Sequence, residues 1–165
     1  MNEEKNLCIL IVDDEQSIVE LFRMWLSDTP YVVAFVNSGE EAVEFLENNS
    51  CNIIVSDVMM PGISGIELLK YVKKRNHDIQ VVIVTGHGNV EMAVEALKYG
   101  ASDFLQKPVE KSKFDESIKR AVYNYHATRQ DHAAEAESDT TVLSGAKLGR
   151  QIGKYHLGNL IGFGS

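Results

Sequence analysis

Residues 7–15 read LCILIVDDE, so a run of six apolar residues ends abruptly in three carboxylates. Four further apolar runs follow at 31–36, 52–56, 80–84 and 103–105, and most of them are rich in valine and isoleucine. A short run without polar alternation is typical of a strand that is covered on both faces, as in a parallel sheet. The sequence therefore predicts five strands.

Helical periodicity fills the intervals between these runs. Apolar residues spaced three or four apart mark five helices, within 18–26, 42–46, 66–72, 90–97 and 114–125. We expect Asp14 or Ser17 to cap the first helix, and Ser38 to start the second in a capping box with Glu41. Gly100 is expected to end the fourth. This alternation predicts a doubly wound α/β fold around a five-stranded parallel sheet.

Chemically versatile side chains stand at the carboxyl ends of the predicted strands. Asp13 and Asp14 follow the first strand, and Asp57 follows the third. Thr85 follows the fourth strand and Lys107 the fifth. Each residue alone has a simpler interpretation, as a helix cap, a turn residue or a surface lysine. In an open α/β sheet, however, the functional site lies beyond the carboxyl ends of the strands, so their coincidence there predicts one shared site.

The residue types at this site favour phosphoryl transfer. Converging carboxylates repel one another unless a cation lies among them, and Mg²⁺ binds through a few carboxylates while keeping several waters. Phosphoryl transfer needs positioning and neutralisation of charge, which Mg²⁺, Lys107 and the Thr85 hydroxyl would supply together. Asp57 would then be the nucleophile that forms an acyl phosphate.

Four segments carry a resemblance to a known family. They are IVDDE at 11–15, IVSDVMMPGISGIELL at 54–69, VVIVTGHG at 81–88 and GASDFLQKP at 100–108. Over about residues 5–126 the chain resembles the response-regulator receiver family, whose members have the flavodoxin-like (CheY-like) fold and act in two-component signalling. The TGHG segment is similar to the nitrogen-regulation and FixJ-like branches of that family.

The resemblance implies a role for each site residue. Asp57 would accept a phosphoryl group from the phosphohistidine of a histidine kinase or phosphotransfer protein. Asp14, Asp57 and the Met59 backbone carbonyl would bind Mg²⁺ directly, and Asp13 would act largely through water. Lys107 would contact the phosphoryl oxygens, and its bond to the following proline would be cis, which few X–Pro bonds are.

The resemblance also implies a switch. Thr85 and Phe104 would form the switch pair, because phosphoryl oxygens draw the Thr85 hydroxyl inward and the aromatic ring moves into the vacated space. The surface around the fourth helix, fifth strand and fifth helix would change as a result. That surface would control an effector in cis, so this chain is expected to be a signalling domain and not an enzyme.

The composition limits the class of protein, its partners and its cellular location. Hydrophobic residues make up 44% and charged residues 24%, as in ordinary globular proteins. The net charge of −8 argues against nucleic-acid binding by this chain, because a duplex binder needs a basic face. Cys8 and Cys51 lack metal-ligand spacing and indicate buried thiols in a reducing compartment. Since no run approaches the roughly 18 apolar residues of a membrane span, we expect a cytoplasmic protein without membrane contact.

The composition changes after the last predicted helix. Residues 127–151 are polar, and we expect a linker that continues the helix toward Glu137 as an exposed or homodimer-forming stalk. Residues 152–165 read IGKYHLGNLIGFGS and resemble the opening strand and first half of the glycine-rich loop of a Ser/Thr protein kinase. We therefore expect a receiver domain at 5–126, a linker at 127–151 and the truncated start of a kinase-like effector at 152–165.

Other protein classes compete with this interpretation. An aspartyl-nucleophile phosphohydrolase has Asp-x-Asp after its first strand, whereas here the aspartates are adjacent and the acceptor follows the third strand. A flavodoxin-like cofactor binder needs a Ser/Thr/Gly-rich phosphate loop where Asp-Asp-Glu stands at 13–15. For the output, a stand-alone or DNA-binding regulator is the alternative to a kinase effector.

Overall fold

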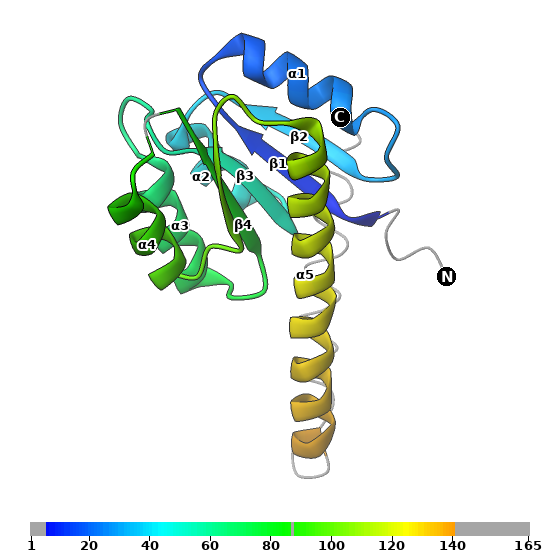
Figure 1. Cartoon of the computed structure of the whole chain (residues 1–165). Coiled ribbons are helices and arrows are strands. Elements are labelled where there is room, and N and C mark those ends of the chain that lie inside the picture. The colour runs from blue at the N-terminus through cyan, green and yellow to red at the C-terminus, as the bar shows by residue number, and fades with distance from the viewer. Residues whose placement is uncertain (1–5, 87, 141–165) are drawn as a thin grey trace.

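The computed structural model describes residues 6–86 and 88–140, with side chains up to residue 131. The strands are β1 (Cys8–Val12), β2 (Val32–Val36), β3 (Ile53–Asp57), β4 (Gln80–Thr85) and β5 (Asp103–Gln106). The helices are α1 (Gln16–Leu26), α2 (Gly39–Asn48), α3 (Gly65–Arg75), α4 (Val90–Lys98) and α5 (Lys111–Thr140). This alternation confirms the predicted doubly wound α/β fold (Figure 1).

All five strands are parallel, in the order β2-β1-β3-β4-β5. The chain passes from β1 outward to β2 and then crosses back to β3 on the other side of β1. Leu10 in β1 is accordingly paired with Ala34 in β2 and with Ile54 in β3. The strand order therefore reverses between β1 and β3, and the carboxyl ends of these two strands mark the place where sheets of this kind carry their functional site.

Helices cover both faces of the sheet (Figure 1). Alternate residues of the strands pack on one side against α1 and α5, through side chains such as Phe22 and Phe114. The other residues pack against α2, α3 and α4, through side chains such as Ala42, Leu69 and Ala96. Every residue of β1, β3 and β4 is buried, which explains why these runs are apolar without alternation.

Three strands extend further than the sequence predicts. β3 includes Asp57 and β4 includes Thr85, because the ladder continues through the pairs Asp57–Val84 and Thr85–Gln106. β5 likewise reaches Gln106 instead of ending at Leu105. Two of the candidate site residues are therefore the last residues of their strands, and backbone pairing holds them in place.

The predicted cap of α1 is wrong. Neither Asp14 nor Ser17 caps this helix: Glu15 occupies the N-cap position, and its side chain makes no capping hydrogen bond. The preceding Asp13 bonds to this turn instead, because its Oδ1 accepts a hydrogen bond from the Glu15 backbone N–H at 2.9 Å. Asp14 points instead toward the site described below.

The other helix boundaries agree more closely with prediction. Ser38 caps α2, because its side chain accepts from the Glu41 backbone N–H. The Glu41 side chain, however, accepts from the backbone N–H of Asn37 and not from that of Ser38, so the predicted capping box is shifted by one residue. A full capping box occurs at α3, between Ser64 and Glu67. α4 ends just before Gly100, as expected.

The last helix continues far beyond the sheet (Figure 1). α5 runs from Lys111 to Thr140, past the Glu137 expected from the sequence. The rest of the predicted linker, the kinase-like segment at 152–165 and His87 in the TGHG motif lie outside the described residues. Across the described part of the chain, no helix combines the length and the apolar character that a bilayer crossing requires.

The aromatic contact between α1 and α5 gives a test of the core. Phe114 stacks on Phe22 with ring centroids 4.6 Å apart and meets Trp25 at 5.3 Å. We expect Phe114→Ala to lower the free energy of unfolding by about 3–5 kcal/mol, because it removes a buried ring and leaves a cavity. Tyr123→Ala, on the same helix but 73% exposed, should change it by less than about 0.5 kcal/mol. Urea unfolding measures both, and equal losses would contradict this packing.

Candidate functional site

Asp57 lies at the carboxyl edge of the sheet as the last residue of β3. Because β3 is flanked by β1 and β4, only 5% of the residue is exposed. The nearby backbone N–H groups of Met59 and Val58 favour the charged form of the Asp57 carboxylate. The Val58 N–H itself donates to the Val84 carbonyl at 3.3 Å, so the chain just after Asp57 still pairs with β4.

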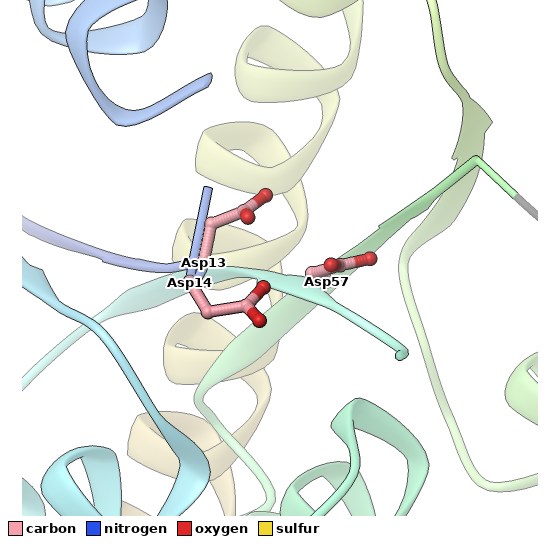
Figure 2. Close-up of side chains that lie close together, drawn as sticks. All are labelled: Asp13, Asp14 and Asp57. Carbon is pink, nitrogen blue, oxygen red and sulfur yellow. The ribbon is translucent and has the colours of Figure 1, made fainter. Parts of the chain in front are cut away.

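Asp13 and Asp14 follow β1, the neighbouring strand. Asp13 is buried, whereas Asp14 is exposed. One carboxylate oxygen from each of Asp13, Asp14 and Asp57 lies within 4.8 Å of the others. Figure 2 shows the three side chains gathered at the ends of the two strands, and we call them the acidic cluster. Strand order alone brings these residues together from positions more than forty apart in sequence.

Lys107 reaches the acidic cluster from the far side of β4. It follows β5, which β4 separates from β3, so only a long side chain can span that strand. Its Nζ lies 3.0 Å from Asp13 Oδ2, 3.5 Å from Asp57 Oδ2 and 3.5 Å from Glu15 Oε1. The Lys107 side chain is only 10% exposed, so these ion pairs are poorly screened by solvent. The Lys107–Pro108 peptide bond is cis, as expected.

Burial dominates the electrostatics of this site. Desolvation raises the pKa of Asp13, although the Glu15 backbone N–H and Lys107 oppose that rise. The pKa of Asp57 is also raised, first by desolvation and then by the Asp13 charge, against the opposing effect of Lys107. For Lys107, desolvation lowers the pKa, but the hydrogen bond and charge of Asp13 and the charge of Asp57 outweigh it and the net direction is upward.

The donor set fits a hard divalent cation. The acidic cluster offers three carboxylates, and among the residues with described side chains one ammonium group, that of Lys107, pairs with it. The pKa values of the two buried carboxylates are raised mainly by desolvation, and for Asp57 also by the charge of Asp13, so Lys107 offsets the cost of charging them only in part. Oxygen donors converging within a few ångströms are the ligands that Mg²⁺ and Ca²⁺ prefer. Met59 stands in the loop directly after Asp57, with its side chain 57% exposed and directed away from the core.

Thr85 and Phe104 lie side by side on neighbouring strands. Thr85 is fully buried at the end of β4, and Phe104 in β5 is partly buried beside the core formed with α2, α3 and α4. A methyl group placed on Gly88 would come within 2.8 Å of both the Phe104 ring and the Thr85 methyl. The two side chains therefore meet at Gly88, in the loop that leads into α4.

The sequence identified most, but not all, of the groups that converge here. Asp13, Asp14, Asp57 and Lys107 share one site, and Thr85 is linked to it because its carbonyl accepts the Lys107 backbone N–H at 2.9 Å. Sequence reasoning missed the Glu15 carboxylate, which contacts Lys107, and the backbone N–H groups near the Asp57 carboxylate. The position of Glu15 next to the aspartate pair could have suggested its role, whereas the position of the backbone N–H groups depends on loop geometry that the sequence does not show.

Comparison with known proteins agrees with this geometry. The family model described as "Response regulator receiver domain" matches residues 9–119. The transcriptional regulatory protein FixJ of Bradyrhizobium diazoefficiens is 33% identical over 144 residues, which cover 87% of this chain and 70% of that protein. The C4-dicarboxylate transport transcriptional regulatory protein DctD of Pseudomonas aeruginosa is 30% identical over 159 residues, 93% of this chain.

A solved structure is similar as well. The solution structure of the beryllofluoride-activated NtrC4 receiver domain dimer has a TM-score of 0.68 and 35% identity, and the match covers 72% of this chain and 98% of that one. By contrast, the chain spans only 34% of the length of DctD. The similarity is therefore to one domain of such larger regulators.

The burial of Asp57 beside Asp13 predicts a pH-dependent stability. Because the folded-state pKa of Asp57 lies above the ordinary value of about 3.9, its protonated form stabilises the fold at acid pH, and that contribution is lost as pH rises through the folded pKa. In the metal-free Asp57→Asn variant the side chain cannot ionise, so this loss of stability does not occur. We expect its Tm to exceed that of the wild type at neutral pH, by a margin that shrinks toward acid pH.

Thermal unfolding in a chelating buffer measures this difference. Asp115→Asn is the matched control, because Asp115 forms an exposed pair with Lys111, which contributes little to stability. A Tm for Asp57→Asn that is below the wild type at neutral pH would contradict the account of the cluster.

Proposed function

Because the chain belongs to the response regulator receiver family of two-component systems, we propose that Asp57 accepts a phosphoryl group from the phosphohistidine of a histidine kinase or phosphotransfer protein. The domain would be a signalling switch and not a turnover enzyme, since its similarity is to regulators. The observation that carries the proposal is the buried Asp57 carboxylate, which lies 3.5 Å from the Lys107 ammonium group within an acidic cluster.

We infer that Mg²⁺ is the cation of this site. Asp14, Asp57 and the Met59 backbone carbonyl would bind it directly, and Asp13 would act through water. When bound, Mg²⁺ neutralises charge on the transferred phosphoryl oxygens. The fit rests on the three clustered carboxylates, whose charge Lys107 balances only in part.

The residues of the chain would divide the transfer step among them. An Asp57 carboxylate oxygen forms a bond to phosphorus while the bond from phosphorus to the histidine nitrogen breaks, and the electron pair of that bond stays on the imidazole. Lys107, already 3.5 Å from the Asp57 carboxylate, would exchange that contact for the phosphoryl oxygens. The backbone N–H groups of Val58 and Met59 would favour the charged form of Asp57, which is the form that attacks phosphorus.

The acyl phosphate would act on the surface through Thr85 and Phe104. The Thr85 hydroxyl would turn toward the phosphoryl oxygens, and the Phe104 ring would enter the space it leaves. Their meeting point at Gly88 lies in the loop before α4, so the change would reach the surface formed by α4, β5 and α5. Val90, Val94 and Leu97 are exposed apolar residues of α4 and would serve effector contact or a homodimer.

The output would lie in the same polypeptide as the receiver. We propose a receiver at 5–126, a linker at 127–151 that begins as the continuation of α5, and a Ser/Thr kinase effector whose opening stands at 152–165. A DNA-binding effector is the alternative, and the transcriptional regulators among the relatives favour it. A downstream catalytic loop or a DNA-binding helix pair in the full-length chain decides between them. A cytoplasmic location stays a prediction.

Labelling with acetyl phosphate tests the proposed function. With Mg²⁺ present, the wild type should gain the mass of one phosphoryl group, because a small acyl phosphate replaces the phosphohistidine as donor. Asp57→Asn should gain none, and a chelator should abolish labelling of the wild type. Intact-mass spectrometry measures all three.

Two outcomes would contradict the proposal. Equal labelling of Asp57→Asn would place the acceptor elsewhere. Sustained hydrolysis of small phosphoesters at many turnovers per second would favour the aspartyl-nucleophile phosphohydrolase instead.

The switch pair has a separate test. Thr85→Ala should still take up the phosphoryl group but should lose most of the amide chemical-shift changes that beryllofluoride and Mg²⁺ cause in α4 and β5, because no hydroxyl moves inward. Thr29→Ala removes a hydroxyl that bonds the Leu26 carbonyl at the end of α1, and it should respond like the wild type. Unaltered shifts in Thr85→Ala would refute this route to the surface.

A further inference from the structure

We propose that Glu40, on α2, is a positioning residue for the metal-binding loop between β3 and α3. This loop, residues 58–64, begins beside Asp57 and contains Met59. The inference rests on the proposed function, because it concerns how tightly the site holds Mg²⁺. Glu40 touches neither the acidic cluster nor Lys107 in any described contact and acts through the loop backbone.

A direct hydrogen bond joins Glu40 to the loop. Glu40 Oε1 accepts from the Ile63 backbone N–H at 2.7 Å, across 23 residues of sequence. A charged acceptor makes a stronger hydrogen bond than a neutral one. The bond lies outside the local capping pattern of α2, where Ser38 and Glu41 already supply the acceptors. Capping α2 therefore does not require the Glu40 side chain, and its contact serves the loop.

The backbone around this bond is shaped to admit the carboxylate. Gly62 has φ +80°, a conformation that favours glycine, and the Glu40 carboxylate lies where a Gly62 side chain would begin. Gly39 packs equally closely, since a methyl group there would come within 2.6 Å of the Ile63 carbonyl oxygen. The start of α2 therefore packs against residues 62–63, and Glu40 adds a hydrogen bond to this contact.

The two ends of the loop are fixed by other bonds. The Gly65 N–H donates to the Val58 carbonyl at 3.0 Å, and the capping box of Ser64 and Glu67 anchors the start of α3. Between these points Met60 is buried, whereas Met59 is exposed, so burial restrains Met59 little. The Glu40 bond adds restraint to the loop from outside the β3–α3 unit.

Groups that orient metal ligands without touching the metal commonly change metal affinity when they are removed. Their loss typically costs tenfold or more. We therefore expect Glu40→Ala to weaken Mg²⁺ binding by about tenfold while the acidic cluster stays intact.

The test measures the Mg²⁺ dissociation constant of the whole chain with the metal alone, by calorimetry or by amide chemical shifts of Asp57 to Met59. Three variants are compared with the wild type. Glu40→Ala removes both the charge and the acceptor, whereas Glu40→Gln removes the charge and keeps an acceptor for the Ile63 N–H. Glu41→Ala is the matched control, because Glu41 carries the same charge in the same helical turn but accepts from Asn37, away from the loop.

We expect weakened binding in Glu40→Ala, near-normal binding in Glu40→Gln and Glu41→Ala, and similar thermal unfolding of the two alanine variants. Equal Mg²⁺ affinities of Glu40→Ala and Glu41→Ala would overturn the inference about Glu40, whereas Mg²⁺ binding by the wild type would leave the proposed function intact. If all three variants bound Mg²⁺ equally weakly, the loss of affinity would come from the lost charge alone, and the inference would again be overturned. No Mg²⁺ binding by the wild type would refute the proposed function itself.

Discussion

The ion pairs of Lys107 with Asp13 and Asp57 are the interaction on which the site depends. Two buried carboxylates at the ends of adjacent strands repel each other, and the ammonium group 3.0 and 3.5 Å away favours the charged form of both. Lys107 reaches them across β4 and compensates for their burial only in part. The site is therefore suited to additional positive charge, and in the proposed function a phosphoryl group bound with Mg²⁺ would supply both a cation and new oxygen partners for the lysine.

Most of the fold and the charged residues of the site could be predicted from the sequence. The unbroken apolar runs of β1, β3 and β4 indicated burial on both faces, and the parallel topology then required Asp13, Asp57, Thr85 and Lys107 to share one edge. What escaped prediction depends on backbone geometry. Asp14 or Ser17 was expected to cap α1, yet the Glu15 N–H bonds to Asp13 and Glu15 takes the N-cap position. The place of Asp14 beside Asp57 agrees with the predicted site.

The contact of Glu40 with the β3–α3 loop could not be predicted from the sequence either, because it too depends on backbone geometry. A glutamate in the first turn of a helix is favourable wherever it occurs, since it complements the helix dipole. The structure shows instead that this glutamate accepts from the Ile63 N–H of another segment, where the positive φ of Gly62 and the close approach of Gly39 to Ile63 make room for it. The site thus combines charged side chains fixed by topology with a loop fixed by close backbone contacts. From this domain α5 continues without a break to Thr140.

A structure of this chain with Mg²⁺ and beryllofluoride tests the central claim most directly. The account predicts beryllium bonded to an Asp57 carboxylate oxygen, Mg²⁺ held by Asp14, Asp57 and the Met59 carbonyl, and Lys107 moved from Asp57 onto a fluorine atom. Beryllofluoride bound at another carboxylate would contradict it. So would a site in which Mg²⁺ avoids Asp57 while Lys107 keeps both of its aspartate partners.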